Sequence, residues 1–348
     1  MIMCQLAAYV GDRDAAPILL KSLLLQEGYL GGHSTGLATS YGGSIHMVKD
    51  IGTTQEVIAK TGIASLKGLI GIAHSRHTSD AIKDSRCNRA QNAHPWLSED
   101  GSIVMMHNGI ITNYEEHWRR LKEHHRFSSL VEELNYITDS EVAIHMLSDK
   151  VKTGLTLAEA LRDTTNRLTG MVLLGAMANS EPKAVYLTNW NQPCYLGVGN
   201  GETMFSSSRI GFNHVEDRFN IFKAPNNSLI KLTPGDVELT KLDETRGFPN
   251  LQMDIDLFGK NVSRLLRERG ELDSFGLLIP LLQRGYDEAY GIEPDKWREI
   301  VKLGYGDAND HFEALEQLTK WGRIRRSVKQ REEAGIIVPR VMWSAPAD

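Results

Sequence analysis

The chain has 348 residues, of which 41% are hydrophobic and 24% charged, and its formal net charge is −5. These values are typical of an ordinary globular protein with one large domain, or one domain with a smaller appendage, and the acidic balance gives no reason to expect nucleic acid as a partner. No apolar run approaches the roughly 18–20 residues of a membrane span, and no basic region of a signal peptide opens the sequence, so we expect a cytoplasmic protein without membrane contact.

The three cysteines, Cys4, Cys87 and Cys194, lie far apart and form no C-x-x-C pair. This spacing indicates a reducing compartment, without a disulfide framework or a zinc knuckle. The histidines are scattered, and the adjacent pair His124-His125 has no other ligand-type residue at helical spacing. The sequence therefore predicts no metal site and no cofactor.

The first predicted strand covers residues 3–11 and contains Cys4. A cysteine in an apolar run is usually a small buried hydrophobic residue. A different role follows if Met1–Met3 are removed, or if translation starts at Met3 and that methionine is lost. Cys4 would then carry a nucleophilic thiol together with an α-amine that takes up a proton near neutral pH.

Two segments follow whose residue types indicate ligand binding. After a predicted helix that begins at Asp14 and ends near Gly28, residues 28–36 are too rich in glycine for a helix or a regular strand, and they predict either a functional loop or a plain connection. Residues 69–73 predict a buried strand that leads to Arg76. A guanidinium group there could grip both oxygens of a carboxylate, or could simply cap the strand at the surface.

A second pair of segments carries amide and acidic groups. The predicted strand 103–106 runs into Asn108-Gly109, which by itself favours a type I′ hairpin turn. Helix-forming residues follow at 114–125, and strand, Asn-Gly and helix in this order suit an amide and a glycine N–H aimed at a developing oxyanion. Thr138 and Glu141 predict a capping box at a helix start, where Asp139 could also bind an ammonium group.

Strand-like runs between residues 171 and 239 are numerous, and the helices are grouped rather than alternating with them, which predicts an α+β fold with antiparallel sheets. Beyond about Arg246, four helical segments are expected at 256–269, 274–284, 294–303 and 309–321. The run 320–331 that follows contains six basic residues. A winged-helix tail that binds nucleic acid is one interpretation, but basic runs are usually solvated faces.

Six short motifs occur in one order at residues 3–4, 29–36, 71–76, 92–95, 107–113 and 138–142. Together they resemble the glutaminase domain of class II glutamine amidotransferases, a family of N-terminal-nucleophile hydrolases, and most closely its glucosamine-6-phosphate synthase type. The resemblance implies a four-layer αββα sandwich at residues 1–245. Residues 246–348 then form a small, mostly helical C-terminal region, for which winged-helix-like packing is the alternative already named.

The resemblance also implies the roles of individual residues. Cys4 is the expected nucleophile and its freed α-amine the expected base. Asn108 and the Gly109 N–H correspond to the oxyanion hole. Arg76 corresponds to the group that binds the α-carboxylate of L-glutamine, and Asp139 to the group that binds its α-ammonium.

The sequence departs from the family in several places. Gln5 stands where a glycine is usual, and the stretch containing His77 and Ser79 replaces a segment that forms a lid in relatives. We carry His77 and Ser79 forward as substrate-binding candidates. The synthase domain that would consume ammonia is missing, so we expect the acceptor synthase on another chain, and homo-oligomerisation stays open.

Three functions are compatible with these residues. The first is glutamine hydrolysis through a thioester on Cys4, which releases glutamate and ammonia. The second is the same nucleophile acting on a different amide, against which the pairing of Arg76 with Asp139 argues. The third is a non-catalytic glutamine sensor that acts through its basic tail.

Overall fold

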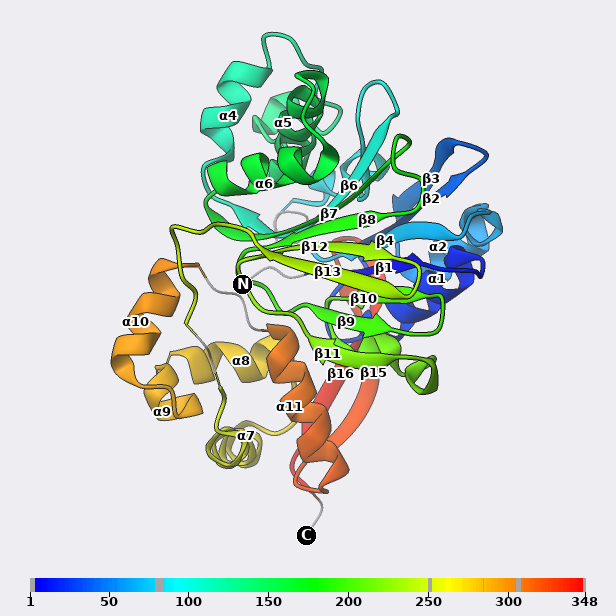
Figure 1. The fold of residues 1–348 in the computed structure, drawn as a ribbon. Helices are drawn as coiled ribbons and strands as arrows, with labels where there is room; N and C mark the ends of the chain where they lie inside the picture. The colour runs from blue at the N-terminus through cyan, green and yellow to red at the C-terminus, as the bar shows by residue number, and fades with distance from the viewer. Residues whose placement is uncertain (1–3, 79–83, 250–251, 284, 305–307, 347–348) are drawn as a thin grey trace.

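The computed structural model describes residues 4–78, 84–249, 252–283, 285–304 and 308–346. Two antiparallel sheets lie face to face, and helices cover both outer faces (Figure 1). The first sheet has the strand order β11-β9-β10-β1-β4-β2-β3 and the second the order β13-β12-β8-β7-β6-β5. The predicted α+β fold with antiparallel sheets and four αββα layers is confirmed.

The strands of the first sheet are β1 (Gln5–Val10), β2 (Ser34–Tyr41), β3 (Ser44–Ile51), β4 (Ile70–Arg76), β9 (Tyr195–Val198), β10 (Thr203–Ser206) and β11 (Asn220–Lys223). Those of the second sheet are β5 (Trp96–Leu97), β6 (Ile103–Ile111), β7 (Gly170–Ala178), β8 (Val185–Asn189), β12 (Ser228–Thr233) and β13 (Asp236–Lys241). The helices on the outer faces are α1 (Ala15–Gln26) and α2 (Thr54–Lys60) on the first sheet, and α4 (Tyr114–Leu121), α5 (Asp139–Lys152) and α6 (Leu157–Arg167) on the second.

The alternation of side chains along β1 explains why the layers form. Leu6, Ala8 and Val10 point between the two sheets, where they join a buried cluster with residues of β6, β7 and β12. Ala7 and Tyr9 point the other way and pack under α1. Because neighbouring residues of a strand face opposite sides, a strand with apolar residues on both faces needs a layer on each side.

A separate region follows the sandwich in the chain. It contains α7 (Ile255–Arg269), α8 (Ser274–Leu282), α9 (Tyr286–Tyr290), α10 (Pro294–Lys302), α11 (Ala308–Lys320) and a small sheet of β14 (Leu272–Asp273), β15 (Arg325–Glu333) and β16 (Ile336–Ser344). Its buried cluster includes Phe258, Phe312 and Trp343, together with Tyr29, Leu30 and Ile210 of the sandwich. The two parts therefore share this buried cluster, whereas the buried residues of the other clusters belong to the sandwich.

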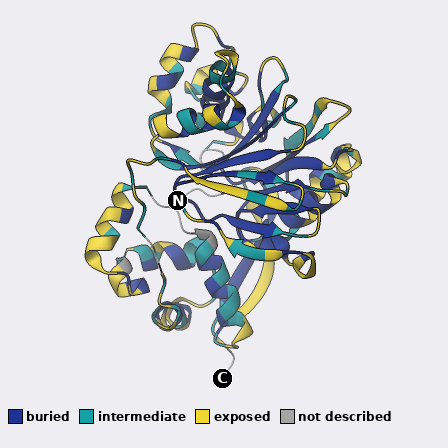
Figure 2. Ribbon diagram, viewed as in Figure 1, coloured by how far each residue is buried: buried dark blue, intermediate teal, exposed yellow. Residues whose placement is uncertain are grey.

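The basic run lies mostly on β15. This strand is at the edge of its sheet, in the order β14-β16-β15, and almost all of its side chains are exposed (Figure 2). Charged side chains on an exposed edge strand protect it from pairing with other chains. In the part of the chain that the structure describes, no helix has the length and apolar character needed to cross a bilayer.

Candidate active site

Cys4 immediately precedes β1 and contacts His77, which follows β4, and Asn108 within β6. Its side chain is buried, and its backbone N–H donates a hydrogen bond to Oδ1 of Asn108 at 2.8 Å. The His77 N–H donates to Sγ of Cys4 at 3.4 Å, and the thiol lies 3.6 Å from the His77 carbonyl oxygen. Burial raises the pKa of the Cys4 thiol to about 11, against the opposing effects of the His77 backbone and the Arg76 charge. A thiol in this position needs a base before it can attack.

Asn108 and Gly109 lie within β6 and not in a turn. They pair with Leu173 and Val172 of β7, and the strand continues to Ile111 before α4 begins at Tyr114. The type I′ turn considered for Asn-Gly is therefore wrong, whereas the expected order of strand, Asn-Gly and helix is confirmed. Gly109 has φ 129°, and a Cβ there would lie 1.9 Å from the Met171 carbonyl oxygen, so only glycine fits.

The amide group of Asn108 is oriented by Cys4. Its Oδ1 accepts the Cys4 N–H, and its Nδ2 is buried with no hydrogen-bond partner among the described residues. A buried donor left unpaired costs free energy unless a ligand satisfies it. The amide is thus positioned to donate to an oxygen atom of a molecule bound next to Cys4.

A cavity of about 230 Å³ opens beside the thiol. Its lining brings together five of the seven residues expected in the site, namely Cys4, Arg76, His77, Gly109 and Asp139. Asn108 contacts this set through Cys4. Ser79, the remaining candidate, lies outside the described residues. The small volume suits a metabolite-sized ligand better than a polymer.

Arg76 ends β4 and has only 7% of its surface exposed. Its Nη2 donates to the hydroxyl of Tyr136 at 3.2 Å, while Nη1 is buried without a hydrogen-bond partner among the described residues. The second branch of the guanidinium is therefore left for a ligand oxygen. Tyr136, which also lines the cavity, carried no signal in the sequence.

Asp139 is the first residue of α5. Its Oδ2 accepts the Ile111 N–H at 2.8 Å, and its Oδ1 accepts the Ser140 hydroxyl at 3.0 Å. These bonds hold a carboxylate at the cavity wall, where the cavity also contains the Arg76 guanidinium. One cation and one anion in the same small cavity can together bind a zwitterion.

The capping box expected at this helix is wrong. Thr138 is the N-cap residue but makes no side-chain cap bond. The Glu141 carboxylate instead accepts hydrogen bonds from the backbone and hydroxyl groups of Ser128 and Ser129. The loop that contains Ser128 and Ser129 therefore binds the Glu141 side chain in place of the Thr138 backbone. This tertiary contact fixes the start of α5.

Three buried histidines surround the backbone that leads to Asn108. His74 Nε2 lies 3.1 Å from the His107 carbonyl oxygen, His94 Nδ1 accepts the His107 N–H at 3.4 Å, and His107 Nδ1 lies 2.9 Å from the Ser140 hydroxyl. Burial lowers the pKa of each of these rings, that of His74 to about 3. Neutral rings at these positions fix the backbone of β6 at His107 by hydrogen bonds and add no charge to the site.

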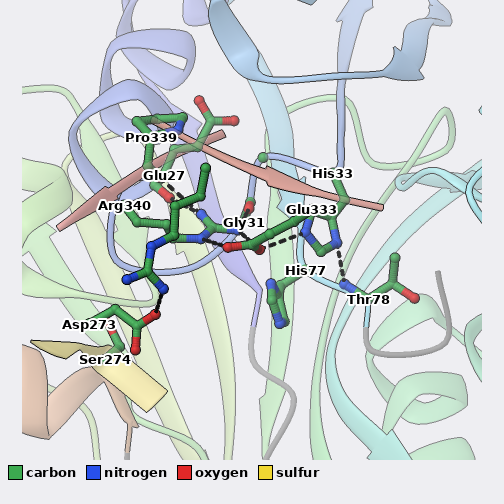
Figure 3. Close-up of polar contacts among 12 residues, drawn as sticks. Glu27, Gly31, His33, His77, Thr78, Asp273, Ser274, Glu333, Pro339 and Arg340 are labelled. Atoms are coloured by element: carbon green, nitrogen blue, oxygen red, sulfur yellow. Dashed lines mark hydrogen bonds and ion pairs between the residues drawn. The ribbon is translucent and has the colours of Figure 1, made fainter. Parts of the chain in front are cut away.

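The C-terminal hairpin β15–β16 contacts the loop that carries Gly31 and His33, next to this site (Figure 3). His33 accepts the Thr78 N–H at its Nδ1, 3.0 Å away, and its Nε2 lies 3.2 Å from the Glu333 carboxylate. Arg340 binds both oxygens of Glu333 and the carbonyl oxygen of Gly31. The hairpin is thereby tied to the glycine-rich loop and, through His33, to the residue that follows His77.

Although His33, His77 and Glu333 lie close enough together to suggest a metal ion, they do not suit one. Because His33 Nδ1 accepts a backbone N–H, its Nε2 carries the proton that it donates to Glu333. The Arg340 guanidinium already neutralises that carboxylate. The His33–Glu333 contact thus connects the hairpin to the glycine-rich loop. Of these three residues, only His77 was among those expected in the site.

Comparison with known proteins shows which family the chain resembles in sequence. A family model described as "Glutamine amidotransferase domain" matches residues 77–212. The isomerizing glutamine–fructose-6-phosphate aminotransferase of Pyrococcus horikoshii is 34% identical over 209 residues, covering 60% of this chain and 33% of that protein. The corresponding protein of Methanothermobacter thermautotrophicus is 35% identical over 207 residues, with 59% and 33% covered. The chain thus spans about a third of the length of these curated relatives.

Solved structures are similar in fold. Glutamine phosphoribosylpyrophosphate amidotransferase from B. subtilis, complexed with ADP and GMP, matches with a TM-score of 0.60 at 16% identity, covering 77% of this chain and 58% of that one. A structure described as the allosteric regulatory enzyme of purine biosynthesis also has a TM-score of 0.60, at 17% identity, with 83% and 64% covered. These likenesses show that the sandwich has the same fold as the matching parts of these two enzymes.

Proposed function

Because the chain contains a class II glutamine amidotransferase domain, we propose that it hydrolyses the side-chain amide of free L-glutamine to glutamate and ammonia. The observation that carries the proposal is the arrangement of four groups around one cavity: a buried thiol, an amide donor and a guanidinium branch that have no partner among the described residues, and a fixed carboxylate. Cys4, Asn108, Arg76 and Asp139 supply them in that order. Each group has a distinct partner on a glutamine molecule.

The reaction requires that residues 1–3 be removed, so that the nitrogen of Cys4 becomes a primary amine. In the proposed first step this amine takes the thiol proton, and the sulfur attacks the amide carbon. The oxyanion that forms is stabilised by Asn108 Nδ2 and the Gly109 N–H, while Asn108 Oδ1 keeps its bond to the Cys4 nitrogen. The protonated amine then gives its proton to the leaving nitrogen, the C–N bond breaks, and ammonia departs from a thioester.

Hydrolysis completes the cycle. The amine of Cys4 accepts a proton from water as the water oxygen attacks the thioester carbon. The C–S bond then breaks, and the proton returns to the sulfur as glutamate leaves. The same two donors stabilise both oxyanions, because the carbonyl oxygen occupies the same place in each step.

Selection of free glutamine is assigned to the two charged groups at the cavity wall. The branch of the Arg76 guanidinium that has no partner among the described residues would bind the α-carboxylate, and the Asp139 carboxylate would bind the α-ammonium. His77 contributes its backbone to the thiol, and its ring packs between those of His33 and Phe275. An amide without a free amino acid end would leave both charges unpaired, which disfavours it.

The ammonia acceptor is proposed to be a synthase on a separate chain. The curated relatives are named as fructose-6-phosphate aminotransferases, and about two thirds of their length has no match in this chain. The region from Ile255 onward packs against the glycine-rich loop beside the site, so a partner that contacts it could alter glutamine hydrolysis. We also propose that copies of this chain associate with one another.

Steady-state kinetics on the processed chain test the proposal. We expect release of equal amounts of glutamate and ammonia from glutamine, with much lower kcat/KM for asparagine, N-acetylglutamine and a peptide containing internal glutamine. Equal activity on N-acetylglutamine would show that the charged pair does not select substrate and would favour a hydrolase of another amide. The proposed acceptor is tested by adding a partner that co-purifies with the chain, which should raise the rate of glutamine hydrolysis. If no synthase is found among the partners from the native proteome, the proposal of an acceptor on a separate chain is contradicted.

A further inference from the structure

A second cluster of ionisable residues lies outside the site just described, where α5 packs on the end of the second sheet. Glu99 follows β5, His125 follows α4, and His145 lies in the middle of α5. Their ligand atoms all lie within 4.8 Å of one another. The two histidine rings pack with centroids 4.3 Å apart.

His125 has a carboxylate at each ring nitrogen. Its Nε2 lies 3.0 Å from Asp149 Oδ1, its Nδ1 lies 3.1 Å from Glu99 Oε2, and its side chain is only 3% exposed. A neutral imidazole has a single N–H, so it can donate to one of these carboxylates only. If the N–H is on Nε2 and points to Asp149, the lone pair of Nδ1 and the Glu99 carboxylate are left to share a cation.

His145 supplies an independent indication of a missing ligand. Its ring hydrogen-bonds the backbone carbonyl of Arg126, yet Nε2 is buried with no hydrogen-bond partner within the described part of the chain. A histidine that binds a metal through one ring nitrogen usually donates the other to a carbonyl or carboxylate group. His145 has the carbonyl and His125 has the carboxylate, so both rings show the outer contacts of metal ligands.

We propose that Glu99, His125 and His145 bind a zinc ion. The ligands would be a Glu99 carboxylate oxygen, His125 Nδ1 and His145 Nε2, with a water molecule as the fourth ligand and Asp149 orienting His125. Two imidazoles and one carboxylate match zinc, whereas magnesium and calcium prefer oxygen ligands alone.

The cluster can close around an ion. Zinc–nitrogen bonds of about 2.0–2.1 Å place tetrahedral ligand atoms roughly 3.3 Å apart. His125 Nδ1 and Glu99 Oε2 are already 3.1 Å apart, whereas the remaining separations, which are at most 4.8 Å, must contract. The Glu99 side chain is 41% exposed, so its carboxylate is free to adjust to the ion as the His145 ring closes on it. A surface cavity of about 510 Å³, lined in part by Glu99 and His145, gives the ion a path inward.

Zinc here would act on structure and not on the reacting amide. It would join the segment after β5, the segment after α4 and helix α5. The first residue of α5 is Asp139, the carboxylate of the proposed glutamine site. Zinc is therefore expected to stiffen the helix that positions Asp139.

Calorimetric titration of chelator-treated full-length protein with zinc chloride tests the proposal, with cobalt(II) absorption and thermal unfolding as further readouts. We expect one zinc ion per chain, a rise in Tm, and cobalt bands of a tetrahedral nitrogen and oxygen site. His145→Gln and Glu99→Gln should abolish binding. Asp149→Asn should weaken it by about 10–100-fold, as is usual for an orienting partner of a ligand.

Matched controls test whether zinc binds at residues outside the proposed cluster. His124→Gln changes the neighbouring histidine, whose side chain is 58% exposed, and Glu333→Gln removes the carboxylate beside His33. Both variants, and protein alkylated at its cysteines, should bind zinc like the wild type. No zinc binding by the wild type, binding retained in folded Glu99→Gln and His145→Gln proteins, or binding lost in Glu333→Gln or alkylated protein would each overturn the proposal.

Discussion

The backbone nitrogen of Cys4 and the side-chain oxygen of Asn108 are joined by a hydrogen bond of 2.8 Å, across 104 residues of sequence. The same amide leaves its Nδ2 buried and unpaired among the described residues. One side chain thus holds the atom that is proposed to become the base and presents a donor to the oxygen of the reacting amide. The two functions of Asn108 can be separated by substitution.

Asn108→Asp keeps the oxygen that accepts from Cys4 but replaces the Nδ2 donor with an oxygen. We expect kcat for glutamine hydrolysis to fall by about 10²–10³, because a donor to the oxyanion is lost. The matched control is Asn179→Asp, which makes the same change at an amide that bonds the Gly101 carbonyl. Steady-state kinetics of both variants check the prediction, and an unchanged kcat in Asn108→Asp would remove Asn108 from the oxyanion hole.

Arg76→Lys retains a positive charge but loses the planar fork. A lysine cannot bond Tyr136 and a carboxylate with the geometry of a guanidinium, so we expect KM for glutamine to rise roughly 10–100-fold, the equivalent of one charge-assisted hydrogen bond, with little change in kcat. Arg119→Lys, at an exposed position on α4, serves as the control and should leave KM unchanged. A fall in kcat at constant KM would instead place Arg76 in the chemical step.

Glu333 gives a prediction about pH. Burial raises the pKa of Glu333, but the hydrogen bonds from His33 and Arg340 outweigh this effect and lower it to about 2, from an ordinary value of 4.5. Because the folded pKa is the lower one, the ionised carboxylate stabilises the fold above about pH 4.5, and this contribution is lost as the pH falls toward 2. Glu333→Gln should therefore be less stable at pH 7 and should lose less stability between pH 4.5 and pH 2.

Urea unfolding at a series of pH values measures this difference. Glu332→Gln is the control, because Glu332 is the exposed neighbour on the same strand. Its stability should follow the wild-type pH dependence. If Glu333→Gln also follows the wild-type curve, the link from the hairpin to His33 does not contribute to stability.

Phe312→Ala tests whether the C-terminal region and the sandwich unfold together. Phe312 is fully buried and its ring lies 5.4 Å from that of Tyr29. We expect a loss of about 3–5 kcal/mol and a single calorimetric transition at lower temperature, because the cluster includes residues of both parts. Val301→Ala, at a position with 56% exposure, should change stability by no more than about 0.5 kcal/mol. Two separate transitions in Phe312→Ala would contradict a shared core.

The features that sequence alone could predict are those with a local pattern. The apolar strand after Cys4, the order of strand, Asn-Gly and helix at residues 103–121, and the helices α7, α8, α10 and α11 follow from local composition and spacing. The short helix α9 was not predicted. Glu141 shows where this approach fails, because its spacing from Thr138 fits a capping box but tertiary contacts with Ser128 and Ser129 prevail.

Contacts between segments that are far apart in the sequence could not be predicted, because no local sequence pattern indicates them. His33 and Glu333 are 300 residues apart, and nothing in the glycine-rich loop indicates that a C-terminal hairpin bonds it. The same is true of Glu99, His125 and His145, which come together only because α4, α5 and the end of β5 pack side by side. The prediction of no metal site considered helical spacing and could not include these contacts.

The most direct test of the account is the intact mass of the protein before and after incubation with an electrophilic glutamine analogue, followed by peptide mapping. We expect a mass that lacks Met1–Met3 and the addition of one label, on Cys4, with free glutamine slowing the labelling. A folded chain that begins at Cys4 and takes no label on that residue would contradict the proposal that this cysteine attacks glutamine.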